Sequence, residues 1–203
     1  MRSIVHPVAL TIVGLWVSPQ VVRAQEVAAY VGFGSAYDSS NGRQIDTFGD
    51  GNLYKTPAMG GFFTSLGAGV FFTKHVGVGA ELSWRNKEGD YAGLLYRPSL
   101  ASFDGILRPT RGTTKRFAPE LHVGIGWARI RYDFNDQPSC DQVPGCPDTT
   151  HFQAHVGAAT RWYVNDHLFL RPAVDVHWVH NLFEFGSNWV PRYSVGVGYS
   201  FGR

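Results

Sequence analysis

The chain has 203 residues, of which 44% are hydrophobic, 14% aromatic and only 17% charged, and it contains 24 Gly and 11 Pro. This length suits a single domain, and the low charge is the opposite of the bias expected for a disordered chain. Lys and Arg number 18 against 16 Asp and Glu. A basic nucleic-acid-binding surface is therefore not expected.

Residues 1–24 have the features of a secretory signal peptide. Arg2 precedes an apolar stretch at 8–17, and Val22-Arg23-Ala24 offers small or aliphatic side chains to a signal peptidase. An N-terminal membrane anchor is the alternative, but about 10 apolar residues are too few for a spanning helix. We expect residues 1–24 to be removed and residues 25–203 to form one exported domain.

Two cysteines, Cys140 and Cys146, lie in a polar, proline-containing segment. Exported chains usually oxidise such a close pair, so a loop disulfide is expected. A metal site is less favoured, because this spacing matches no common zinc motif and no second cysteine pair completes four ligands.

Apolar residues recur at every second position in eight segments, which is the periodicity of strands. The segments are 26–36, 60–73, 76–85, 96–107, 117–127, 152–164, 168–178 and 189–201. The fourth is the least regular and contains Pro98. Short connections alternate with long ones, as in bacterial outer-membrane barrels. The predicted fold is all-β: an eight-stranded antiparallel up-and-down transmembrane β-barrel with a polar lumen filled by side chains.

The two faces of these strands differ in chemistry. Aromatic residues lie on the apolar face near strand ends and predict two interfacial girdles: Trp84, Trp127 and Trp178 at one end, and Trp162, Tyr199 and Phe201 at the other. The apolar face is therefore expected to meet lipid. The alternative is a soluble lipocalin-like barrel in which these are ordinary core aromatics.

The opposite face collects charges and histidines: Glu81, Glu120, Arg161, Arg171, Asp175 and Arg192, with His122, His155 and His177. An eight-stranded barrel has an interior that side chains just fill, and charges buried there must be paired. We therefore predict a packed ion-pair network rather than a water channel. The apolar cavity of a soluble barrel would not accommodate these charges.

The closing segment YSVGVGYSFGR, at 193–203, resembles the final strand of small OmpA-like and OmpX-like outer-membrane β-barrels, and the pattern of the chain is similar throughout. The resemblance implies a monomer in the cell outer membrane, surrounded by lipid and lipopolysaccharide and inserted by the barrel assembly machinery. The family's last strand usually ends on an aromatic residue, whereas Gly202 and Arg203 follow Phe201 here.

The predicted function is a structural or surface-interaction role through external loops such as 37–57, which are candidates to bind an extracellular ligand. No nucleic acid partner, cofactor, metal or catalytic residue is expected. The first alternative is a narrow pore for ions or small solutes.

The second alternative is a lipid-modifying hydrolase. The segment 177–187 contains His, Glu and Ser, as the small outer-membrane lipid A deacylases do, but His180 and Ser187 are seven residues apart rather than nearly adjacent. A metal site would use Asp175 with His177 and His180, or His122 with His155 across the lumen. Hydrogen-bonded lumen histidines are the favoured interpretation.

Overall fold

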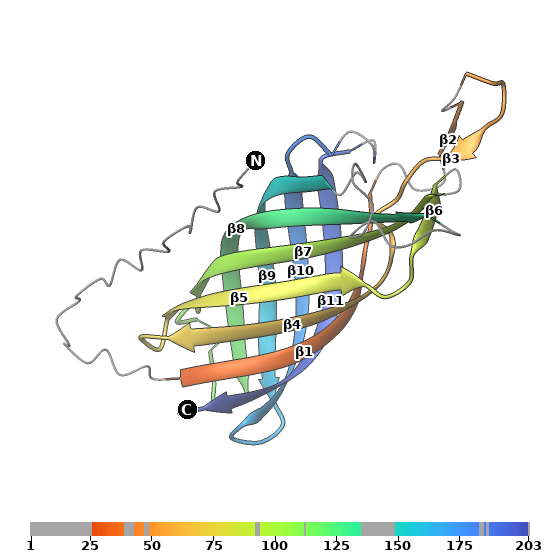
Figure 1. The fold of residues 1–203 in the computed structure, drawn as a ribbon. Helices are drawn as coiled ribbons and strands as arrows, with labels where there is room; N and C mark the ends of the chain where they lie inside the picture. The colour runs from red at the N-terminus through yellow and green to blue at the C-terminus, as the bar shows by residue number, and fades with distance from the viewer. Residues whose placement is uncertain are drawn as a thin grey trace, which may run out of the picture.

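Eight long antiparallel strands form the wall of a barrel in the computed structural model (Figure 1). The structure describes residues 26–38, 43–46, 49–91, 94–111, 113–134, 149–182, 185 and 187–202. The wall strands are β1 (Glu26–Ala36), β4 (Gly61–Phe71), β5 (Val76–Arg85), β7 (Leu94–Leu107), β8 (Phe117–Phe134), β9 (Thr149–Tyr163), β10 (Leu168–Val179) and β11 (Trp189–Phe201). The short β2 (Gln44–Ile45) and β3 (Tyr54–Lys55) pair with each other, and β6 (Gly89–Tyr91) pairs with β7.

The ring of strands is closed. Consecutive wall strands pair antiparallel along the chain, β5 pairs with β7, and the last strand, β11, pairs with the first, β1. Closure leaves no free sheet edge, which hydrocarbon would not tolerate. The predicted eight-stranded up-and-down barrel is thus confirmed. Within the described ranges, no helix is both long and apolar enough to cross a membrane.

Two strands are longer than predicted. β8 continues seven residues past the expected end at Trp127, and β9 begins at Thr149 rather than 152. The alternation goes on in this extension, with Ile130 buried and Arg129 exposed. The outward residues of this extension are polar. The strand was predicted from apolar residues at every second position, so its continuation past Trp127 was missed.

Pro98 does not interrupt β7. One side of β7 pairs first with β6 and then with β5. The pairing with β6 includes Tyr96, and the pairing with β5 reaches only to Ser99, so Pro98 lies in the gap between these two partners. A residue without a backbone N–H costs no ladder hydrogen bond at such a position. The strand therefore runs unbroken from Leu94 to Leu107.

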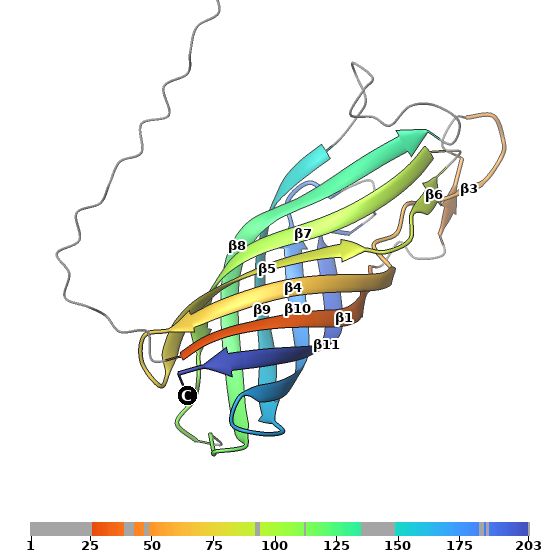
Figure 2. The ribbon, with the colours of Figure 1, turned by 60° about the horizontal axis from the view of Figure 1, so that its bottom comes forward.

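The two ends of the barrel differ. The connections 72–75 and 164–167 and the described parts of 108–116 lie at the same end as the start of β1 and the end of β11 (Figure 1). The strand ends that the long connections join, such as the end of β8 and the start of β9, lie at the opposite end, called here the long-loop end. β7 and β8 reach further at the long-loop end than β4 and β5 do (Figure 2). Their pairing continues to Leu94 opposite Phe134, whereas β5 leaves β7 at Ser99.

The apolar face of each strand points outward, as predicted. Val123, Ile125 and Trp162 are each more than half exposed, while Glu120, His122 and Arg161 on the other face are buried. The exterior is thus suited to lipid. Residues 1–24 and the two cysteines, Cys140 and Cys146, lie outside the described residues, so the signal peptide and the disulfide remain predictions.

An arginine in the middle of the apolar band should destabilise the barrel far more than one at its edge. Val123 lies midway along the apolar part of β8 and is 65% exposed, while Val164 follows β9 at the short-turn end and is 64% exposed. In lipid vesicles, Val123→Arg should lower the free energy of unfolding by about 2–4 kcal/mol and Val164→Arg by at most about 1 kcal/mol. Urea unfolding measures both, and equal small losses would contradict a lipid-facing exterior.

Candidate functional site

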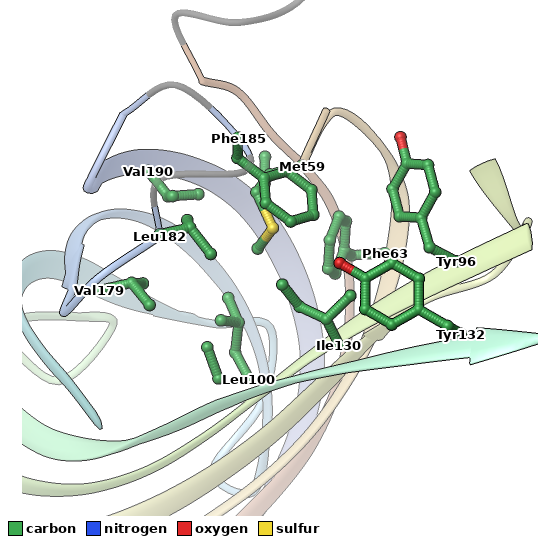
Figure 3. Packing of buried hydrophobic residues seen from close by; sticks show 12 residues of the cluster. Met59, Phe63, Tyr96, Leu100, Ile130, Tyr132, Val179, Leu182, Phe185 and Val190 are labelled. Atoms are coloured by element: carbon green, nitrogen blue, oxygen red, sulfur yellow. The ribbon is translucent and has the colours of Figure 1, made fainter. Parts of the chain in front are cut away.

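The long-loop end of the lumen is closed by a hydrophobic plug. Its members are Ala36, Met59, Phe63, Tyr96, Leu100, Ala128, Ile130, Tyr132, Val179, Leu182, Phe185 and Val190, all buried (Figure 3). Met59, Leu182 and Phe185 come from connections and pack on strand residues. The buried carboxylate of Asp38 accepts a hydrogen bond from the backbone N–H of Met59. This contact ties the first long connection down over the lumen.

A compact ionic cluster occupies the short-turn end of the lumen. Arg108 donates to Glu26 at 2.5 and 2.9 Å and to Glu120 at 3.0 and 3.1 Å. Arg161 lies 2.8 Å from each of the same two carboxylates. The guanidinium of Arg108 also stacks 3.5 Å from the ring centre of Phe71. All five side chains are buried, so the charges are held by one another rather than by water.

The middle of the lumen continues this network. Arg171 Nε lies 3.5 Å from Glu120, and its Nη1 lies 3.9 Å from Glu81, which also accepts a hydrogen bond from Tyr30. Arg192 then bridges Glu81 and Asp175, reaching the second carboxylate at 3.0 Å. Opposite charges thus alternate along the barrel axis from the turn end toward the plug.

The structure joins all six predicted lumen charges, which are Glu81, Glu120, Arg161, Arg171, Asp175 and Arg192, into one chain of contacts. Sequence reasoning missed Glu26, Arg108 and Asp104. These three occupy inward positions of the period-two pattern at the start of β1, just past β7 and within β7. Asp104 and Arg108 could have been found by extending the period-two pattern through the irregular fourth strand and past its end.

Three buried histidines lie between the ionic network and the plug. His122 Nε2 pairs with Asp175, and His155 Nε2 lies 3.2 Å from Asp104. His177 Nδ1 lies 3.1 Å from the side-chain oxygen of Gln153. The rings of His155 and His177 are 4.7 Å apart between centres.

The predicted girdle residues all lie on the outward face of the barrel. Trp127, Trp162, Tyr199 and Phe201 are exposed, and Trp84 and Trp178 are partly buried. Trp189, which the sequence analysis left out, is 58% exposed and stands directly opposite Trp178 on the neighbouring strand. Trp127 sits within β8 rather than near its end, because β8 continues to Phe134.

The described residues of the hydrolase segment 177–187 do not form a catalytic arrangement. The hydroxyl of Ser187 accepts a hydrogen bond from the backbone N–H of Trp189 at 3.1 Å. The backbone carbonyl of His180 lies 3.1 Å from His151 Nδ1. Glu184 lies outside the described residues. Among the described residues of 177–187, no hydroxyl is paired with a histidine base, as nucleophilic catalysis requires.

A closed ring of strands with an apolar exterior and a polar, filled lumen defines an outer-membrane type of β-barrel. The chain belongs to the outer membrane protein beta-barrel domain family, whose sequence model matches residues 8–202. Membership of this family places the chain in the outer membrane.

Solved structures of similar fold agree with this assignment. Neisserial surface protein A is 13% identical with a TM-score of 0.58, and the match covers 87% of this chain and 97% of that one. Ail of Yersinia pestis is 10% identical with a TM-score of 0.56, covering 87% and 98%. OprG of Pseudomonas aeruginosa is 17% identical with a TM-score of 0.51, covering 88% and 96%. No curated protein sequence matches the chain.

Removing one arginine from the lumen should cost much more stability than removing an exposed one. Arg161→Gln leaves Glu26 and Glu120 short of a positive charge in a buried site, so the free energy of unfolding should fall by about 3–5 kcal/mol. Arg97→Gln breaks a pair with Glu88 that is largely exposed, so the loss should be at most about 1 kcal/mol. Urea unfolding in vesicles measures both.

The double variant Arg161→Gln/Glu120→Gln restores the charge balance and should recover part of the lost stability. If the double variant is as unstable as the sum of its two single variants, the two side chains do not act as an ion pair.

Proposed function

We propose that the protein is a non-catalytic outer-membrane barrel with a structural and surface-interaction role, and that its external end binds the phosphate groups of lipopolysaccharide. The observation that carries this proposal is an abrupt change of chemistry on the outward face of β7 and β8. On β8 the outward apolar residues end at Trp127, and Arg129 and Arg131 follow, with Arg97 beside them on β7.

The arginines lie close together on one face. Arg97 on β7 stands opposite Arg131 on β8, and Ser99 stands opposite Arg129. Arg97 pairs with Glu88 at 2.6 Å, and Arg131 lies 3.4 Å from Asp133, with both arginine side chains at least 39% exposed. Exposed ion pairs are weak, so a phosphate can compete for these side chains. The planar guanidinium matches phosphate geometry in a bidentate manner.

The position of Trp127 supports a membrane boundary at this height. Indole rings prefer the interface between hydrocarbon and headgroups, and the arginines begin directly beyond this residue on the same face. In the outer leaflet this is the level of the lipopolysaccharide phosphates. A barrel of this fold with a bound anionic saccharide also has a precedent, because Ail has been solved in complex with the heparin analogue sucrose octasulfate.

The closed lumen favours this proposal over a pore. The hydrophobic plug covers one end of the described barrel, and the cluster of Arg108 with Glu26 and Glu120 fills the other. A pore would need a continuous water path through both. Insertion by the barrel assembly machinery and the monomeric state belong to the same proposal, and β11, with its alternating outward Tyr193, Val195 and Val197, is the strand we expect that machinery to engage.

Replacing the three arginines should weaken binding of lipopolysaccharide. Arg97→Gln/Arg129→Gln/Arg131→Gln should raise the Kd of the refolded barrel for lipopolysaccharide by about 100-fold, since each surface cation contributes about 1 kcal/mol. Calorimetric titration in detergent measures the Kd. The matched control is Lys74→Gln/Lys115→Gln/Arg116→Gln at the short-turn end, which should bind like the unaltered protein. Equal losses in both variants would show only a general charge effect and overturn the proposal.

The unaltered barrel should not conduct. Reconstituted into planar bilayers, it should give no steady channel openings, because buried side chains fill its lumen. Insertion is verified in parallel by the heat-dependent change in electrophoretic mobility of closed barrels. Discrete, reproducible openings from fully folded protein would favour the pore instead.

A further inference from the structure

The strand register gathers histidines and a carboxylate into one layer of the lumen. His122 on β8 stands opposite Gly157 on β9, and His155 on β9 stands opposite Gly124 on β8. Asp175 on β10 also stands opposite Gly157. A side chain at Gly157 would collide with both Asp175 and His122, so glycine leaves the space in which they meet. His122, His155 and Asp175 each offer a ligand atom, and these atoms lie within 4.8 Å of one another.

This layer contains ring nitrogens that the protein does not satisfy. His122 Nδ1, His155 Nδ1 and His177 Nε2 are buried without a hydrogen-bond partner among the described residues. Leaving a buried polar atom without a hydrogen bond costs free energy. Three such ring nitrogens in one layer therefore call for an explanation. Ser83 Oγ, Ser200 Oγ and Arg192 Nε also lack a partner among the described residues, but the histidine layer brings three such ring nitrogens together.

The tautomer of His177 is set by its neighbour. The amide nitrogen of Gln153 donates to the backbone carbonyls of Ala101 at 2.8 Å and Trp127 at 3.2 Å. Its oxygen therefore faces His177 Nδ1, which must donate the hydrogen bond at 3.1 Å. The lone pair of His177 is then on Nε2, the buried nitrogen without a partner. An outer partner that fixes a histidine in this way is typical of metal sites.

The charge of the layer also favours a cation. The ion-pair network together with Asp104 contains five carboxylates, Glu26, Glu81, Asp104, Glu120 and Asp175, against four arginines, Arg108, Arg161, Arg171 and Arg192. Among these acidic and arginine side chains, the formal charges leave one negative charge in excess. Asp104 pairs with His155 rather than with an arginine, so the excess lies beside the histidines.

A small cavity borders one of the three candidate ligands, His122. A cavity of about 10 Å³ is lined by His122 and Asp104, enough for about one water-sized occupant. Arg161 and Arg171 line its other side, and Glu120 pairs with both.

We propose that His122, His155 and Asp175 bind one divalent transition-metal ion of the zinc type inside the barrel, with His177 as the adjacent imidazole. Two imidazoles and one carboxylate suit Zn²⁺, Co²⁺, Ni²⁺ or Cu²⁺ and do not suit Ca²⁺ or Mg²⁺, which require a shell of oxygen ligands. Arg192 bonds the other oxygen of Asp175 at 3.0 Å and orients the ligand oxygen toward His122.

The test uses Co²⁺ as a spectroscopic probe, because its visible absorption reports nitrogen and oxygen ligation. The untagged barrel is refolded in detergent with Co²⁺ present and then titrated. We expect one equivalent bound, with visible bands of a four- or five-coordinate ion and competition by Zn²⁺ but not by Mg²⁺. His122→Gln/His155→Gln and, separately, Asp175→Asn should weaken binding by at least about tenfold.

The matched control replaces the four described histidines outside this layer, His75, His151, His167 and His180, by Gln, and should bind Co²⁺ like the unaltered protein. Folding of every variant is checked by its heat-dependent mobility. Should the double His122/His155 variant misfold, His177→Gln provides a milder test and should alter the Co²⁺ spectrum. Failure of the unaltered protein to bind, or loss of binding only in the four-histidine control, would overturn the proposal.

Discussion

The need to satisfy every backbone hydrogen bond inside lipid determines the rest of this structure. Hydrocarbon offers no partner for a free N–H or carbonyl, so a sheet that spans it must close on itself. Here β11 returns to β1, and every wall strand has two neighbours. Once the ring is closed, the strict alternation of side chains sends one residue to lipid and the next to the lumen. The chemistry of each position follows from that division.

A narrow ring imposes a second constraint, because long polar side chains must fit within it. Small residues opposite large ones provide the space: a side chain at Gly67 would collide with Tyr30, just as one at Gly157 would collide with His122. Charges then alternate from Arg108 through Glu120 and Arg171 to Glu81, so each desolvated group has an opposite neighbour. The lumen becomes a packed interior held by ion pairs.

The parts of this architecture that depend on local periodicity could be predicted from the sequence. Val123 and Ile125 alternate with His122 and Gly124, and that alone indicates a strand and its two faces. The plug could not be predicted, because Met59, Leu182 and Phe185 come from connections whose path depends on contacts far apart in the chain. The end of β8 was hidden for another reason: beyond Trp127 the strand leaves the apolar band, so its outward residues change from apolar to arginine while the backbone continues unchanged.

The same separation of faces indicates where this barrel can interact with other molecules. Inside, most arginines are held by buried carboxylates, and a ligand would have to break those pairs to reach them. Outside, Arg97 and Arg131 hold their carboxylates at the surface, where water already weakens the pairs. An anionic partner therefore gains most at the external end of β7 and β8. The histidine layer brings together three ring nitrogens that have no hydrogen-bond partner among the described residues, so a cation can bind there without displacing an arginine.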